Sequence, residues 1–497
     1  MSFKIAFIGA GSIGFTRTLL RDILSVPEFH DITVGFTDIS KRNLEMAVLL
    51  CQKDIDANGL KIKIEADTDR RKILKDARYI FNVVRIGGLE AFKYDIEIPL
   101  KYGVDQCVGD TLGPGGIMYA QRGIPAVLEF CKDIREVCEP DALFLNYANP
   151  NAMITWAANK YGNVKCIGLC HGVQGGHEQI AKVLGLPKKE VDIICAGINH
   201  QTWYIQVRHK GKDMTGKLLE AFEKHPEYSK TEKVRIDMLR RFGYYSTESN
   251  GHLSEYVPWY RKRPEEINRW IDLSCWINGE TGGYLRVCTE GRNWFETDFP
   301  RWLKEPAWVY APENRSEEHG SWILEGLETG RIYRGHFNVI NRGVITNLPF
   351  DCVVEVPGYV DRNGINIPVI GDLPLGCAAV CNASIQVQRL AVEAAVKGDD
   401  LLLRQAMMMD PLTGAVCNPE EIWQMTDELL VAEKEWLVQY KDAIKEAEKR
   451  LATGKRVKTK DDYKGAARLP VKSIEELRKE KELAEKLLAA DKSKAKT

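Results

Sequence analysis

The sequence lacks the features of membrane-bound, secreted and nucleic-acid-binding proteins. Its formal net charge is −1, so no basic excess favours contact with nucleic acid or an anionic membrane surface. No hydrophobic run is long enough to span a bilayer, and the N-terminus has neither the basic segment nor the apolar core of a signal peptide. The 13 cysteines include no CxxC pair, which favours reduced thiols. We therefore expect a cytoplasmic protein with no nucleic-acid and no membrane partner.

The chain has enough length and hydrophobic content for more than one core. It contains 497 residues, of which 44% are hydrophobic and 28% charged. Over the first 200 residues, short apolar runs alternate with amphipathic stretches, a rhythm typical of a parallel sheet covered by helices. The predicted strands are Lys4–Gly9, Ile32–Thr37, Tyr79–Val84, Leu143–Tyr147 and Val164–Leu169. The fold class is therefore α/β, with an N-terminal Rossmann domain.

The pattern changes at about residue 200, which predicts a second domain. The later predictions are a strand over Thr202–Val207, strands of a second, mixed sheet within Arg331–Leu348 and Val353–Val360, and helices over Ser384–Asp399 and Pro419–Leu451. We expect a Rossmann domain over 1–198, an α+β catalytic and substrate domain over 199–452, and a charged helical C-terminal extension over 453–497. The extension is interpreted as a solvated helix, with a partner-binding tail as the alternative.

A glycine-rich turn follows the first predicted strand. Gly9, Gly11, Ser12, Ile13 and Gly14 fit the pattern GxGxxG, in which backbone amides reach a pyrophosphate at a helix N-terminus. Asp38 ends the second predicted strand, at the distance expected of a carboxylate that accepts hydrogen bonds from ribose hydroxyls. A carboxylate also repels a 2′-phosphate, so the pattern favours NAD over NADP. The alternative is a glycine-rich turn of another α/β protein.

Several polar residues follow later strands, where an open α/β sheet forms its ligand crevice. Cys170 and His200 could share a divalent metal with open coordination positions, although a buried thiol and a structural histidine are the simpler interpretations. Asp110 lies in a glycine-dense loop and Asn149 precedes a proline, so both fit either a ligand site or turn chemistry. The segment Tyr244–Tyr256 is rich in groups that can move protons, and it also fits a plain polar loop.

Taken together, the motifs resemble glycoside hydrolase family 4, the NAD- and manganese-dependent glycosidases, and most of all its α-galactosidase branch. The resemblance extends to about residue 450 and depends on a specific order of segments. These are KIAFIGAGS, VVRIGG, VGDTLGPGGIM, NYANP, GLCHGVQG, CAGINH, STESNGHLSEY and NLPFDCVVEVPGYVD. It implies Mn²⁺ held by Cys170 and His200, a sugar contact by Asn149, and a cofactor contact by Arg85. It also implies assembly as a homodimer or homotetramer.

The resemblance further implies three catalytic residues. Asp110 takes the place of a carboxylate that tunes the active-site base, and His171 follows the metal cysteine, where phospho-sugar members carry Asp or Asn. His252 falls where those members carry a catalytic Tyr, with Glu248 and Tyr256 as the other candidates for the base. In the family mechanism, NAD⁺ takes hydride from sugar C3, a base removes the acidified C2 proton with Mn²⁺ assistance, and elimination and water addition follow.

Two departures from the family bear on the substrate. Phe92 falls where phospho-sugar members carry a phosphate-binding Arg, which argues for a non-phosphorylated α-glycoside, above all an α-galactoside. The tetrapeptide CHGV also fits α-glucosidase-like and α-glucuronidase-like members, where the α-galactosidase branch has CHSV, so α-glucosides, α-glucuronides and α-galacturonides stay as alternatives. Outside the family, the alternatives are a 2-hydroxy-acid-type NAD dehydrogenase and a non-catalytic dinucleotide sensor.

Overall fold

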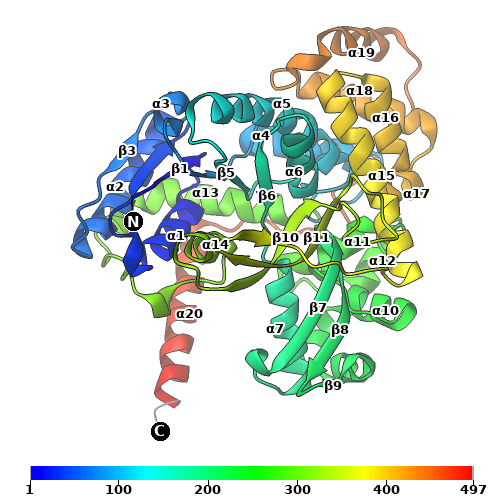
Figure 1. The fold of residues 1–497 in the computed structure, drawn as a ribbon. Helices are drawn as coiled ribbons and strands as arrows, with labels where there is room; N and C mark the ends of the chain where they lie inside the picture. The colour runs from blue at the N-terminus through cyan, green and yellow to red at the C-terminus, as the bar shows by residue number, and fades with distance from the viewer. Residues whose placement is uncertain (1, 495–497) are drawn as a thin grey trace.

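The computed structural model describes residues 2–494 and is built around one sheet of twelve strands (Figure 1). The strand order is β3-β2-β1-β4-β5-β6-β10-β11-β7-β8-β9, and β12 pairs with β11. The strands are β1 Lys4–Ile8, β2 Thr33–Thr37, β3 Ile64–Ala66, β4 Tyr79–Asn82, β5 Leu143–Asn146, β6 Lys165–Gly168, β7 Val191–Ile198, β8 Gln201–His209, β9 Lys212–Asp213, β10 Tyr333–Ile340, β11 Val353–Asp361 and β12 Gly364–Asn366.

Helices lie on both faces of the sheet and at its ends (Figure 1). They are α1 Ile13–Leu24, α2 Lys41–Ala57, α3 Arg70–Leu74, α4 Gly88–Lys101, α5 Gly113–Val137, α6 Asn151–Lys160, α7 Gly172–Leu184, α8 Leu218–Lys224, α9 Tyr228–Thr231, α10 Lys233–Phe242, α11 Asn250–Tyr256, α12 Pro264–Trp270, α13 Gly283–Trp302, α14 His319–Thr329, α15 Leu375–Lys397, α16 Asp400–Met409, α17 Pro411–Val416, α18 Pro419–Ala432, α19 Lys441–Thr453 and α20 Ile474–Lys494. Among the described residues, no helix combines the length and hydrophobicity needed to cross a bilayer.

The first six strands form a parallel sheet, in which five strands were predicted and β3 was not. From β3 through β2, β1, β4 and β5 to β6, every neighbouring pair is parallel. Alternate residues of β1 enter different cores: Ile5 and Phe7 join the one that includes α1 and α2, whereas Ala6 and Ile8 join the one that includes α5 and α6. This confirms the predicted Rossmann-type α/β fold.

The predicted second sheet is wrong. β10 and β11 form an antiparallel hairpin that continues the first sheet between β6 and β7. One row of paired residues crosses all four strands: Gly168 faces Asn338, Asn338 faces Glu355, and Glu355 faces Gly197. Because β6 and β7 each join the hairpin through a single pair, nothing in the local sequence pattern marks the connection.

The C-terminal region begins with a segment that has no regular structure. Residues 455–473 lie between α19 and α20 without a helix, and Ala467 in this segment is buried against Ile267 and Ile271. The charged helix α20 follows and projects from the body of the molecule (Figure 1). The predicted Pro419–Leu451 helix is divided into α18 and α19. The predicted boundary after residue 198 falls at the turn between β7 and β8, and the three-domain division stays a prediction.

Candidate functional site

The glycine-rich turn joins the end of β1 to the start of α1. Gly9 has φ +89°, and a Cβ there would lie 2.8 Å from Val84 Cγ1, so the position requires glycine. Ser12 stands at the N-cap, but its side chain makes no capping hydrogen bond, and the first turn of α1 has no acidic residue. The first N–H groups of α1, which begins at Ile13, are therefore available to an anionic group. Gly14 faces open space.

Asp38 is hydrogen-bonded to this turn. Its Oδ2 accepts a hydrogen bond from the backbone N–H of Gly11 at 2.9 Å, and its Oδ1 accepts one from Ser40 at 2.8 Å. A Cβ on Gly11 would lie 2.7 Å from the same carboxylate. The carboxylate is thus fixed at the end of β2, beside the helix N-terminus, as an acceptor for the hydroxyls of a nucleotide ribose.

Asp110, Arg85 and Asn149 come together near the ends of β4 and β5. Asp110 is fully buried, and its Oδ2 lies 3.4 Å from Arg85 Nη2 and accepts a 3.2 Å hydrogen bond from Asn149 Nδ2. Its Oδ1 has no partner among the described residues. Burial raises the pKa of the Asp110 carboxyl, and the positive charge of Arg85 opposes that shift.

Arg85 is enclosed by three aromatic rings. Its guanidinium carbon lies 4.6 Å from the ring centre of Phe92, 5.2 Å from that of Tyr119 and 5.3 Å from that of Tyr284. The structure therefore places Arg85 against Asp110, while its predicted contact with the cofactor stays a prediction.

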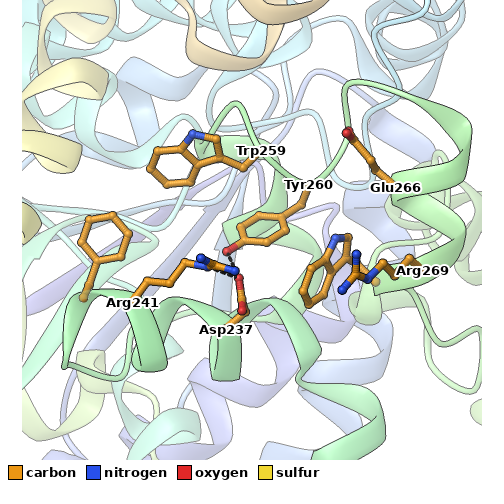
Figure 2. A pocket seen from close by; sticks show the side chains of 8 residues that line it. Asp237, Arg241, Trp259, Tyr260, Glu266 and Arg269 are labelled. Atoms are coloured by element: carbon orange, nitrogen blue, oxygen red, sulfur yellow. Dashed lines mark hydrogen bonds and ion pairs between the residues drawn. The ribbon is translucent and has the colours of Figure 1, made fainter.

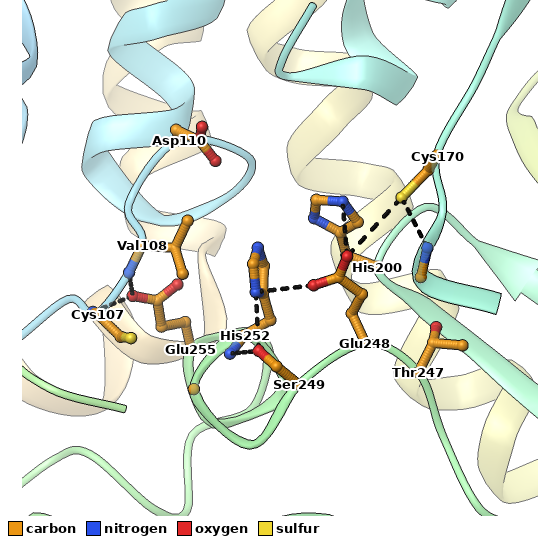
Figure 3. A network of polar contacts seen from close by, with 12 residues as sticks. Cys107, Val108, Asp110, Cys170, His200, Thr247, Glu248, Ser249, His252 and Glu255 are labelled. Carbon is orange, nitrogen blue, oxygen red and sulfur yellow. Dashed lines mark hydrogen bonds and ion pairs between the residues drawn. The ribbon is translucent and has the colours of Figure 1, made fainter. Parts of the chain in front are cut away.

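Cys170, His200 and Glu248 form a cluster in which the first two are buried and Glu248 is part-buried (Figure 3). One donor atom of each lies within 4.8 Å of the others; Glu248 Oε1 is 3.9 Å from Cys170 Sγ and 3.8 Å from His200 Nε2. His200 Nδ1 is buried with no hydrogen-bond partner in the described part of the chain. A thiolate, an imidazole and a carboxylate suit a divalent ion and leave coordination positions open.

The cluster joins two predicted ligands to a residue expected only as an alternative base. Cys170 follows β6, His200 occupies the turn after β7, and Glu248 precedes α11. Burial acts to raise the pKa of Glu248, but the imidazoles of His252 and His200 outweigh it and hold the value at about 2. Burial lowers the pKa of His200 to about 4, so its imidazole is neutral and able to ligate.

His252, on α11, lies beside the cluster next to Glu248 (Figure 3). Its Nδ1 lies 3.0 Å from Ser249 Oγ and 3.1 Å from Glu248 Oε2, and its ring meets that of His200 edge to face at 4.5 Å. Burial lowers the pKa of His252, against the effect of the Glu248 carboxylate. With Nδ1 engaged by these neighbours, Nε2 is the ring atom left to accept a proton.

His171 and Tyr256 occupy opposite environments. The His171 side chain is 68% exposed, and its Nδ1 lies 3.2 Å from Glu318 Oε1. The hydrogen bond to Glu318 raises the pKa of His171 to about 9, which favours the protonated form. Tyr256 is enclosed in the hydrophobic core, and burial raises the pKa of its hydroxyl well above the usual value. A buried, protonated phenol is a poorer base than His252.

Sequence reasoning missed two polar residues behind the cluster. Asn199 donates a 3.2 Å hydrogen bond to Glu355 Oε2, while Glu355 Oε1 is buried without a partner among the described residues. Burial raises the pKa of Glu355 to about 8. Glu355 interrupts the run of valines at the start of β11, and that interruption is the sequence signal for it.

A separate cavity of about 680 Å³ opens elsewhere on the molecule (Figure 2). Its lining residues are Asp237, Arg241, Phe242, Trp259, Tyr260, Glu266, Arg269 and Trp270. None of them belongs to the cluster or to the glycine-rich turn, so the cavity is distinct from the candidate site.

Comparison with known proteins gives consistent matches along the chain. Residues 4–186 match the model of family 4 glycosyl hydrolases, and residues 195–413 match that of the family 4 glycosyl hydrolase C-terminal domain. The α-galactosidase of Rhizobium meliloti (strain 1021) is 61% identical over 98% of this chain and 99% of its own length. The α-galactosidase of Bacillus subtilis (strain 168) is 35% identical over 88% of this chain and 100% of its own.

The fold has a close counterpart among solved structures. The 6-phospho-β-glucosidase from Thermotoga maritima, solved with manganese, NAD⁺ and glucose-6-phosphate, superposes with a TM-score of 0.72 at 24% identity. The match covers 87% of this chain and 99% of that one.

Proposed function

The chain belongs to family 4 of the glycosyl hydrolases, and we propose that within this family it hydrolyses neutral α-galactosides with the help of NAD⁺ and Mn²⁺. The observation that carries the proposal is the convergence of Cys170, His200 and Glu248, whose donor atoms lie within 4.8 Å of one another. The 61% identity to the α-galactosidase of Rhizobium meliloti supports the choice of sugar. Assembly as a homodimer or homotetramer and a cytoplasmic location stay predictions.

The residues present fit both cofactors. For NAD⁺ they offer a glycine turn, uncapped N–H groups at the start of α1, and the Asp38 carboxylate. For Mn²⁺ they offer three donor atoms within 4.8 Å of one another, with His200 Nε2 3.8 Å from Glu248 Oε1. When bound, the nicotinamide accepts and later returns the hydride of sugar C3, and the metal ion polarises the sugar oxygens beside it.

The remaining steps fall to side chains of this protein. His252 Nε2 takes the C2 proton, because the Glu248 carboxylate beside Nδ1 favours the tautomer whose Nε2 can accept a proton. The protonated His171 donates a proton to the departing oxygen of the aglycone, and Glu318 holds its imidazole in place. Asn149 and Asp110, which are hydrogen-bonded to each other, orient the sugar hydroxyls. Water then adds to the sugar, so the reaction is hydrolysis without net redox change.

The surroundings of Arg85 favour a neutral sugar. Phe92 is fully buried, and its ring packs against the guanidinium of Arg85. Asp110 is the carboxylate that pairs with Arg85. A phosphate dianion would have to break the pair between Arg85 and Asp110, and burial of an unpaired dianion is costly.

Turnover of four nitrophenyl α-glycosides tests the proposed substrate. With NAD⁺, Mn²⁺ and a thiol reductant present, we expect kcat/KM for the α-galactoside to exceed that for its 6-phosphate, the α-galacturonide and the α-glucoside by at least about tenfold. Preference for the 6-phosphate would overturn the proposal that the substrate is neutral. Preference for the galacturonide or the glucoside would retain the family chemistry and replace the sugar.

A further inference from the structure

A segment between α19 and α20 is hydrogen-bonded to α4 and α13, and we call residues 455–473 the strap. Its backbone makes hydrogen bonds along its whole length. Lys460 N–H donates to Lys101 O at 2.7 Å, and Ala467 O accepts from Thr281 N–H at 2.9 Å. Lys472 N–H donates to the carboxylate of the buried Glu290 at 2.7 Å. The strap also lies beyond residue 413, where the family match ends.

The centre of the strap closes around the carboxylate of Asp105. Asp105 is fully buried, and its Oδ2 accepts 3.0 Å hydrogen bonds from the Tyr463 hydroxyl and from the backbone N–H of Ala466. Thr281 Oγ1 donates to the same carboxylate at 2.8 Å, and Arg261 Nη2 pairs with its Oδ1 at 2.6 Å. A buried carboxylate needs such donors, and the strap supplies two of them.

Asp105 lies in the loop that leads to Asp110, and its ion-pair partner contacts α11, the helix that carries His252. Arg261, its ion-pair partner, lies 3.4 Å from Ser254 Oγ on α11. On the same helix, Glu255 accepts hydrogen bonds from the backbone N–H groups of the loop, at 2.7 Å from Val108 and 3.5 Å from Gly109. Figure 3 shows Glu255 against the backbone of Cys107 and Val108, with His252 on its other side.

We propose that the strap is a positioning element of the active site. It clamps Asp105 and Arg261, which in turn set the spacing between the loop over residues 105–110 and α11. This step rests on the proposed function, because it takes Asp110 and His252 to act on the sugar. Tyr463 and the Ala466 amide touch neither substrate nor cofactor and work through Asp105.

Substitution at Gly465 displaces the strap in the full-length protein. Gly465 has φ +103°, and a Cβ there would lie 2.3 Å from Thr281 Cγ2 and 2.6 Å from its Oγ1. Gly364→Ala is the matched control, because Gly364, the first residue of β12, has φ +111° but faces open space. Both variants carry the same type of backbone strain, and only one of them disturbs Asp105.

Two readouts are compared at a temperature where both variants are folded. For Gly465→Ala, we expect amide hydrogen exchange in peptides spanning residues 105–112 to quicken at least about tenfold and kcat for the α-galactoside to fall at least about tenfold. The Kd for NAD⁺ should stay within about twofold of the control. Should Gly465→Ala fail to fold, Tyr463→Phe removes one donor to Asp105, and Tyr359→Phe on the exposed part of β11 serves as its control; a smaller loss of kcat, of about threefold, is expected.

The outcomes separate this proposal from the proposed function. Unchanged exchange over residues 105–112 in Gly465→Ala overturns the positioning role whether or not the enzyme is active. Faster exchange in a protein whose wild type cleaves no α-galactoside would retain the clamp and overturn the substrate. Equal kcat values for Gly465→Ala and Gly364→Ala, together with faster exchange, would overturn the link between the clamp and catalysis.

Discussion

Glu248 has contacts in two directions. On one side its Oε1 faces Cys170 and His200, and on the other its Oε2 lies 3.1 Å from His252 Nδ1. A carboxylate with a pKa of about 2 is a weak proton acceptor at neutral pH, which favours it as a ligand over a base. Burial raises the pKa of the Cys170 thiol, and only a metal ion or another positive charge makes a thiolate stable there.

Removal of the Cys170 thiol should abolish metal binding. We expect Cys170→Ala to raise the Kd for Mn²⁺ by more than about a hundredfold, and Glu248→Gln to raise it by at least about tenfold, because each removes a donor from an open site. Electron paramagnetic resonance of free Mn²⁺ measures both. Cys195→Ala, which removes an equally buried thiol that donates to Thr202 instead, is the control and should bind Mn²⁺ normally. Tight Mn²⁺ binding by Cys170→Ala would refute the ligand set.

His252 should control exchange of the sugar C2 proton with solvent. Nuclear magnetic resonance in D₂O with bound galactoside should show His252→Gln slowing C2 exchange by at least about a hundredfold, since a positioned base contributes at least that much. Affinity for Mn²⁺ should change little. His177→Gln, on α7 with its ring at Val191 O, is the matched control. If Glu248→Gln stops exchange while His252→Gln preserves it, the two residues must exchange roles.

At the scale of elements, the β10–β11 hairpin sets the distance between the two halves of the metal site. The row from Gly168 through Asn338 and Glu355 to Gly197 aligns the ends of β6 and β7. Cys170 follows that row by two residues and His200 by three, so both reach the same place. A shift of the hairpin register by two residues would separate the donors beyond the reach of one ion.

Asp38, at the end of β2, should control nucleotide affinity. We expect Asp38→Ala to raise the Kd for NAD⁺ at least about tenfold, because two ribose hydroxyls lose a charged acceptor. Calorimetric titration with NAD⁺ measures the change. Asp67, which follows the neighbouring β3 and lies 2.9 Å from Lys72, provides the control, and Asp67→Ala should bind NAD⁺ as the wild type does. Unchanged NAD⁺ affinity in Asp38→Ala would place the ribose elsewhere.

The sequence predicted the elements better than their connections. Five of the six parallel strands were predictable because each is a short, mainly apolar run between turn residues, whereas β3 is a three-residue strand with a central Glu65 and was not predicted. The segment from Gly9 to Gly14, together with Asp38, was predictable because it has a known role in nucleotide binding. Glu248 lies 78 residues from Cys170 and 48 from His200, and no spacing rule joins such distant side chains. The continuous sheet and the strap depend on single residue pairs and on hydrogen bonds from backbone to side chain, which leave no periodic pattern.

At the scale of the whole molecule, the residues that carry the proposed reaction lie along one edge of the sheet. The glycine-rich turn follows β1, Asp38 follows β2, and Cys170 follows β6, so all three lie at the carboxyl ends of parallel strands. The part of the chain that follows β7 adds His200, Glu248 and His252 to that edge. Binding of the nucleotide needs only the glycine-rich turn and Asp38, whereas transient oxidation followed by elimination also needs the metal donors and a base.

Simultaneous measurement of released nitrophenol and accumulated NADH tests this reaction most directly. The purified enzyme, freed of nucleotide and resupplied with Mn²⁺, should cleave nitrophenyl α-galactoside only after NAD⁺ is added. Each NAD⁺ should then support many turnovers, while NADH stays below the enzyme concentration, because the hydride returns to the same sugar. Formation of one NADH for every sugar converted, or cleavage at full rate without NAD⁺, would contradict a hydrolase that uses its nucleotide as a catalyst.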